Sequence, residues 1–148
     1  KQEPVTTVVE MARAAHTSSP WEAPLYAAQP AAGFPAPADD LVERSLDIND
    51  LVVENPTATF FVRVAGDSME GRGIFHGDVL VVDRSVTPKD GSVVVAAVYG
   101  EMVVKALKKQ GATHTLISAH DGYEPIHVNE NDDCYIWGVV VGSVRRFV

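Results

Sequence analysis

The fold is decided by residues 92–107, which read SVVVAAVYGEMVVKAL. Two short apolar runs rich in valine, Ser92–Val98 and Met102–Leu107, flank the connection Tyr99-Gly100-Glu101. β-branched residues favour strands, and a short connection that contains glycine is typical of the turn between two antiparallel strands. We therefore predict a β-hairpin here.

Short apolar runs separated by turn residues continue on both sides of this hairpin. Four further segments are strand-like: Thr59–Val64, Val79–Val82, Thr115–Ser118 and Tyr135–Val144. Turn residues separate the strands, namely Gly71-Arg72-Gly73, His76-Gly77-Asp78, Asp90-Gly91 and Asp121-Gly122. Before them, Leu46–Val53 holds one short helical turn, which is stopped by Asn55-Pro56. Regular short strands with few helices predict a mainly β domain over residues 41–148, a curled antiparallel sheet or partly closed barrel.

Residues 1–40 differ in composition, because they hold six of the nine prolines of the chain. Prolines at this density break any long helix, so we predict an extended N-terminal arm. One short helix fits Thr7–Ala15, with Thr6 or Thr7 as its cap. A disordered tail would have a similar composition. Four apolar residues that a purely solvated tail would not need argue against it: Trp21, Leu25, Tyr26 and Phe34.

The overall composition excludes several classes of protein. The 148 residues are 46% hydrophobic and 22% charged, which is close to the globular average and excludes a wholly disordered chain. The net charge of −8 makes direct binding to the nucleic-acid backbone an unfavourable prediction, since that affinity comes from Lys and Arg. No apolar run approaches the roughly 18 residues of a membrane span, and no signal-peptide pattern follows Lys1. A single cysteine, Cys134, cannot form an internal disulfide, so we expect a reducing, cytoplasmic environment.

The segment Gly66-Asp67-Ser68-Met69 follows the apolar strand and is the first candidate for chemistry. A small, polar turn with glycine at a strand end can expose a nucleophile and direct backbone N–H groups at it. A serine in a turn is nevertheless far more often a capping or turn residue. The segment also departs from the nucleophile-elbow pattern, which has glycine two residues after the serine, where this chain has Glu70.

The second candidate is Lys105, which shares its strand face with Val103 and Leu107 and therefore projects from an apolar patch. Burial disfavours the ammonium form and lowers the pKa of a lysine. A neutral amine can take the proton of a serine hydroxyl, which is the activation that a Ser-Lys dyad needs. The alternative is a lysine whose stem packs on apolar surface while its amine reaches water.

Other kinds of site have weaker support. The five histidines form no recognisable triad pattern with Ser68: His16, His76, His114, His120 and His127. One cysteine and scattered histidines show no metal-ligand spacing, and no phosphate-binding glycine-rich loop is present. We therefore predict no metal and no cofactor.

Several sequence blocks together carry a family resemblance. In chain order they are Gly66-Asp67-Ser68-Met69, Gly73-Ile74, Gly77-Asp78, Val82-Asp83-Arg84, Asp90-Gly91, Gly100-Glu101 and Val104-Lys105. From about Gly33 to the C-terminus, the chain resembles the self-cleaving serine peptidase domain shared by LexA repressors, related phage repressors and UmuD-type mutagenesis proteins. The resemblance implies that Ser68 is the nucleophile and Lys105 the general base. It also implies cleavage of the chain's own Ala32–Gly33 bond and a dimeric, β-rich fold.

Within this family the chain is most similar to the UmuD-type branch. The segments Ala32–Asp40 and Asn55–Val62 carry that similarity. A LexA-type repressor has a helix-turn-helix domain before its cleavage site, and we expect none in the proline-broken residues before Gly33. On this basis we expect the backbone N–H groups of Ser68 and Met69 to stabilise the oxyanion.

The UmuD-type resemblance implies a function in the SOS response. The trigger for self-cleavage would be a RecA filament on single-stranded DNA, and the processed form would join a UmuC-like Y-family catalytic subunit as part of an error-prone translesion polymerase. Two alternatives are a non-cleaving regulatory binding subunit on the same fold and the peptidase domain of a LexA-like repressor. A signal-peptidase-like protease would normally need a membrane anchor, for which the sequence shows no candidate.

Overall fold

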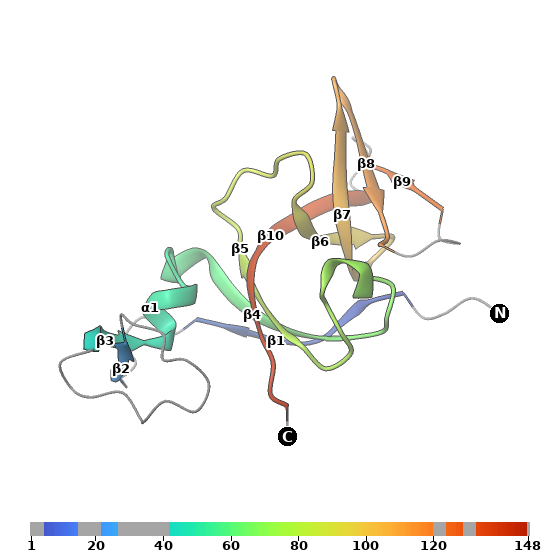
Figure 1. The fold of residues 1–148 in the computed structure, drawn as a ribbon. Coiled ribbons are helices and arrows are strands. Elements are labelled where there is room, and N and C mark those ends of the chain that lie inside the picture. The colour runs from blue at the N-terminus through green and yellow to red at the C-terminus, as the bar shows by residue number, and fades with distance from the viewer. Residues whose placement is uncertain (1–4, 15–21, 27–41, 120–123, 129–132, 148) are drawn as a thin grey trace.

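The structure is a computed structural model that describes residues 5–14, 22–26, 42–119, 124–128 and 133–147, and the account below concerns these residues. Its main feature is an eight-stranded antiparallel sheet with the order β1-β4-β5-β10-β6-β7-β8-β9 (Figure 1). These strands are β1 (Thr7–Arg13), β4 (Thr59–Ala65), β5 (Val79–Asp83), β6 (Val93–Val98), β7 (Glu101–Gln110), β8 (Thr113–Ile117), β9 (Ile126–His127) and β10 (Cys134–Val144). A two-stranded sheet pairs β2 (Glu22–Tyr26) with β3 (Val42–Asp47).

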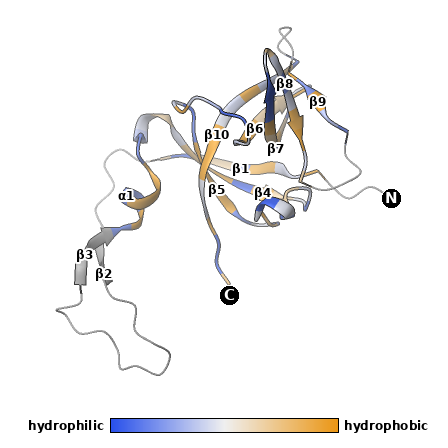
Figure 2. Ribbon diagram, turned by 45° about the horizontal axis from the view of Figure 1, so that its top comes forward, coloured by the Kyte–Doolittle hydropathy of each residue, from blue (hydrophilic) through white to orange (hydrophobic). Residues whose placement is uncertain are grey.

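Three short helical segments complete the fold. They are α1 (Ile48–Val52) and the single 3-10 turns η2 (Pro56–Ala58) and η3 (Glu70–Arg72). Asp47 caps α1, because its side chain accepts a hydrogen bond from the N–H of Asn49 at 2.8 Å. The apolar residues of α1, coloured orange in Figure 2, include Ile48 and Leu51, which are exposed. No helix in the described part of the chain is long and apolar enough to cross a membrane.

The main sheet curls until its first strand meets its sixth. β1 pairs with β4 along its length, from Thr7 opposite Ala65 to Arg13 opposite Phe60. At its N-terminal end β1 also reaches β7, where Thr7 pairs with Val103. This pairing brings the N-terminal end of β1 next to β7. β8 and β9 continue beyond β7, so the sheet is strongly curled rather than a closed barrel.

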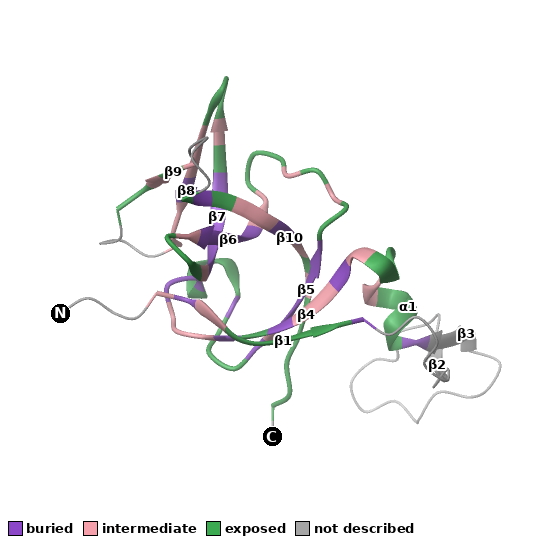
Figure 3. Cartoon of the chain, turned by 180° about the vertical axis from the view of Figure 1, so that it is seen from behind, coloured by how far each residue is buried: buried purple, intermediate pink, exposed green. Residues whose placement is uncertain are grey.

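Both faces of the central strands are buried. One core cluster contains Val95, Val104 and Ala106, and the other contains Val94, Val103 and Leu107. Successive residues of β6 and β7 therefore enter different clusters, as strand geometry requires. Figure 3 shows that β7 and β8 are exposed where the two strands meet in their turn, whereas residues 103–107 of β7 and Leu116 of β8 are buried. A lysine on the inner part of β7 is consequently surrounded by the core.

The predicted mainly β fold and the predicted hairpin are confirmed. β6 and β7 pair from Val93 opposite Ala106 to Val98 opposite Glu101. Tyr99 and Gly100 make the turn with φ of +48° and +83°, and such a two-residue turn matches the twist of its strands. The helical turn predicted in Leu46–Val53 is confirmed as α1, and the remaining predicted strands correspond to β4, β5, β8 and β10.

The helix predicted at Thr7–Ala15 is wrong, because residues 7–13 form β1. Its apolar stripe was weak, and β4 offers a long antiparallel partner that satisfies the backbone of β1. The strands β2, β3 and β9 were not predicted. Trp21 and Phe34 lie outside the described residues, and the division of the chain at residue 40 stays a prediction.

Candidate active site

Ser68 lies in the loop between β4 and η3, and its side chain is fully buried. Its hydroxyl makes two hydrogen bonds with one residue of the N-terminal segment. The Thr6 N–H donates to Ser68 Oγ at 2.9 Å, and the Ser68 hydroxyl donates to Thr6 Oγ1 at 3.0 Å. Thr6 is also fully buried. The segment that precedes β1 therefore covers the hydroxyl in this state.

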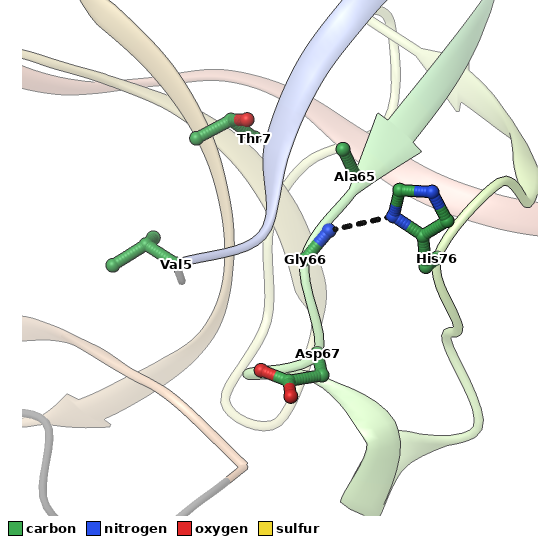
Figure 4. Close-up of a pocket in the computed structure, with 6 residues that line it drawn as sticks. All are labelled: Val5, Thr7, Ala65, Gly66, Asp67 and His76. Atoms are coloured by element: carbon green, nitrogen blue, oxygen red, sulfur yellow. Dashed lines mark hydrogen bonds between the residues drawn. The ribbon is translucent and has the colours of Figure 1, made fainter. Parts of the chain in front are cut away.

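Gly66 allows this close approach. Its φ is +106°, and a Cβ at this position would lie 2.6 Å from the carbonyl oxygen of Val5. Glycine is the residue that adopts such a conformation without strain and leaves room for a neighbouring backbone. A pocket lies beside this contact, and Figure 4 shows Val5 and Thr7 on one side of it and Ala65 and Gly66 on the other.

Lys105 lies in the inner part of β7, and its side chain is only 2% exposed. Burial lowers the pKa of Lys105 below its usual value, since the ammonium ion is poorly solvated there. Its Nζ donates a hydrogen bond of 2.6 Å to the Oγ of Ser118. The structure thus places an amine with a lowered pKa in the core.

The loop of Ser68 and the strand of Lys105 are joined through two shared neighbours. Thr6, which holds the Ser68 hydroxyl, accepts a 2.9 Å hydrogen bond at its carbonyl oxygen from the N–H of Val104. On the other side, the N–H of Ala119 donates to the Ser68 carbonyl oxygen at 3.0 Å, next to Ser118. The two predicted dyad residues therefore come from segments that pack on the same neighbours.

Met69, the second predicted oxyanion donor, anchors the loop in the core. Its side chain is fully buried among residues of β4, β5 and β6. Its carbonyl oxygen accepts hydrogen bonds from the N–H groups of Arg72 and Ile74 at 3.0 and 3.2 Å. These contacts fix the backbone that follows Ser68. Ala32 and Gly33, the predicted cleavage site, lie outside the described residues.

A pocket of about 340 Å³ lies beside this loop. It is lined by Val5, Thr7, Ala65, Gly66, Asp67 and His76 (Figure 4). The ring of His76 accepts a hydrogen bond from the Gly66 N–H at Nδ1, at 3.3 Å. Asp67 Oδ1 is buried and has no hydrogen-bond partner among the described residues. Because Asp67 directly precedes Ser68, the pocket opens next to the candidate nucleophile.

An ion pair between the buried Asp78 and the exposed Arg145 braces the segment that follows the site. Asp78 is 1% exposed, and Arg145 donates to its two carboxylate oxygens at 2.7 and 2.9 Å. The hydrogen bond from Arg145 holds the pKa of Asp78 below its usual value against the effect of burial. Arg145 also donates to the Gly73 carbonyl and stacks over Phe75. Residues 73–78 are thereby tied to the C-terminal end of the chain.

Sequence reasoning missed Thr6 as a partner of Ser68 and Ser118 as a partner of Lys105. Thr6 was interpreted as a helix cap, and no local signal connects it with a residue 62 positions away. Ser118 lay at the end of a predicted strand, and the register of that strand could have indicated its neighbour. Among the described residues, no group of three His, Cys, Asp or Glu side chains could hold a metal ion.

Comparisons with known proteins place most of the chain within one family. The profile of the family described as "Peptidase S24-like" matches residues 24–141. Protein ImpA of Salmonella typhimurium is 48% identical over 129 residues, which cover 83% of each chain. Protein MucA of Escherichia coli is 39% identical over 122 residues, 82% of this chain and 83% of MucA.

The chain also resembles the LexA repressor of Pseudomonas chlororaphis, with 40% identity over 117 residues. That match covers 78% of this chain but only 57% of the repressor, whereas ImpA and MucA are covered over most of their length. The chain therefore belongs to the Peptidase S24-like family and is a UmuD-type member of its LexA and UmuD group.

Proposed function

We propose that this protein is a self-cleaving serine peptidase of the SOS response that cuts its own Ala32–Gly33 bond with a Ser68–Lys105 dyad. The observation that carries the proposal is a buried lysine with a lowered pKa, on a strand that shares two neighbours with the Ser68 loop. Family membership supplies the reaction class, since the S24-like description is that of a peptidase.

In the proposed reaction the neutral Lys105 amine takes the proton of the Ser68 hydroxyl as Oγ attacks the carbonyl carbon of Ala32. The backbone N–H groups of Ser68 and Met69 stabilise the negative charge that develops on the carbonyl oxygen. The protonated lysine then gives its proton to the leaving amine of Gly33. Water hydrolyses the acyl-enzyme, with Lys105 again as the base, and residues 1–32 are released.

The described arrangement is a resting state of this reaction. Ser68 is fully buried, and its hydroxyl both accepts a hydrogen bond from the Thr6 N–H and donates one to Thr6 Oγ1. The carbonyl of Ala32 can reach Ser68 Oγ only after Thr6 withdraws. A trigger could therefore act by stabilising the open state with the cleavage site docked, without adding a catalytic group. We assign this role to a RecA filament on single-stranded DNA in the cytoplasm.

After cleavage, the processed form acts as an accessory subunit of an error-prone translesion polymerase, with a UmuC-like Y-family catalytic subunit. This part of the proposal rests on the UmuD-type sequence blocks. Exposed apolar side chains on β1 and α1, namely Val9, Met11, Ile48 and Leu51, support contact with a partner such as a second copy of the chain. The net charge of −8 supports an indirect relation to DNA.

A second candidate is a regulatory binding subunit that does not cleave itself. The observation that favours it is the complete burial of Ser68 beneath Thr6. If Thr6 never withdraws, the fold persists while the peptidase site stays closed, and the N-terminal segment only regulates assembly.

The intact mass of the purified protein, followed over time at stepwise increasing pH, separates the two functions. We expect a species that begins at Gly33 in the wild type, formed faster as Lys105 loses its proton. Ser68→Ala and Lys105→Ala should abolish it. A wild-type chain that stays whole even with RecA, single-stranded DNA and ATP would contradict the peptidase proposal and support the regulatory one.

A further inference from the structure

Ser118 lies directly across from Lys105. The antiparallel register of β7 and β8 pairs Ala106 with Ile117 and Leu107 with Leu116. One step further along this register, residue 118 is opposite residue 105. Directly opposed residues of an antiparallel pair have Cβ atoms about 5 Å apart, so their side chains meet. The other strand beside Lys105 is β6, which places Val94 opposite it. Val94 is apolar, and Ser118 contributes a polar atom.

The contact between the two side chains is a short hydrogen bond. Lys105 Nζ donates to Ser118 Oγ at 2.6 Å. A neutral lysine amine has one lone pair and two N–H bonds. An N–H held by Ser118 restricts the rotation of the amine about its Cε–Nζ bond.

The segment of Ser118 and Ala119 also contacts the loop that contains Ser68. The Ala119 N–H donates to the Ser68 carbonyl oxygen at 3.0 Å. Gly71, in the turn after Ser68, packs so closely that a Cβ there would lie 2.5 Å from the Ala119 carbonyl oxygen. Residues 118 and 119 therefore contact both halves of the candidate dyad, one through a side chain and the other through its backbone.

We infer that Ser118 is a positioning residue that orients the Lys105 amine toward Ser68, while Ala119 sets the position of the Ser68 loop. The inference rests on the proposed self-cleavage. Ser118 accepts a hydrogen bond from the amine in both protonation states and exchanges no proton with the substrate. Because an acceptor binds an ammonium ion more strongly than a neutral amine, Ser118 also opposes the effect of burial on the lysine.

The test compares Ser118→Thr with Ser118→Val in the full-length chain. The two replacements have nearly the same shape, and only threonine keeps the hydroxyl. Self-cleavage is followed by intact mass across a pH series. Thr113→Ala, on the exposed end of the same strand, is the matched control. Thermal unfolding of each variant shows that the fold is intact.

We expect Ser118→Thr and Thr113→Ala to cleave within about threefold of the wild type. Ser118→Val should be slower at its high-pH plateau by about 10- to 100-fold, the loss typical of a misplaced catalytic group. The midpoint of its pH profile should also move to lower pH. A residue with only a structural role would reduce folded protein without moving that midpoint.

Equal plateau rates for folded Ser118→Val and Ser118→Thr would overturn the inference while leaving the dyad intact. A wild-type chain that never cleaves would instead overturn the proposed function. In that case, NMR titration of the Lys105 side chain in wild type and Ser118→Val still tests the contact, because an unchanged midpoint would exclude a role for Ser118 at the amine.

Discussion

Replacing Thr6 with valine should speed up self-cleavage. Valine keeps the branched shape of threonine but removes Oγ1, which accepts the hydrogen bond of the Ser68 hydroxyl. In the described state Ser68 is fully buried, so its hydroxyl would lose this acceptor without gaining water. Once Thr6 withdraws, Ser68 is free to bond to solvent. The substitution therefore raises the free energy of the covered state and leaves that of the open state nearly unchanged.

The size of the effect follows from that single lost contact. A buried polar group left without its partner costs about 1–3 kcal/mol, which changes the ratio of covered to open chains by about 5- to 150-fold. The Thr6 N–H still donates to Ser68 Oγ, which favours the lower part of the range. Since only the open state accepts the Ala32 carbonyl, the rate of cleavage should rise by the same factor until most chains are open.

The assay is the rate at which the species beginning at Gly33 appears, measured by intact mass at fixed pH. Thr7→Val is the matched control, since it changes a threonine in the same way on the opposite face of the strand. A folded Thr6→Val protein that cleaves no faster than wild type would refute the idea that Thr6 restrains Ser68. An equal acceleration by Thr7→Val would show that the effect comes from the strand as a whole.

Three further predictions concern stability, and each is measured by urea unfolding. Burial lowers the pKa of Lys105 in the folded chain below its usual value of 10.5. Between the folded and the unfolded pKa the unfolded chain binds more protons, so the free energy of unfolding of the wild type rises with pH. Lys105→Met should be more stable than the wild type near neutral pH and should lack this rise. The lowered pKa of Asp78 implies stability that is present above pH 3.8 and is lost as the pH falls through the pKa of the folded state. Asp78→Asn should lose less stability over that range. An identical acid profile would contradict the stabilising role of the pair with Arg145. Gly66→Ala should lower the free energy of unfolding by about 1–3 kcal/mol, because a side chain is strained at a φ of +106° and its Cβ would meet the Val5 carbonyl. An unchanged free energy of unfolding would mean that Val5 is not closely packed against residue 66.

The predictions from sequence were most successful where the signal is local. The hairpin of β6 and β7 follows from valine-rich runs and from Tyr99 and Gly100, whose positive φ values a tight turn requires. The helix predicted at Thr7–Ala15 failed for the opposite reason. Its local pattern was weak, and a strand some fifty residues away, β4, provides the backbone partners that decide its structure.

By itself, the sequence determined the mainly β class, the hairpin and the two residues, Ser68 and Lys105, that carry the resemblance to a self-cleaving peptidase. Their catalytic roles stay predictions. Only the tertiary structure decided that Thr6 covers Ser68 and that Ser118 holds the Lys105 amine. The physical reason is that composition and periodicity report which faces are buried. A particular hydrogen-bond partner depends instead on where the sheet closes on itself and on the register of strands that meet there.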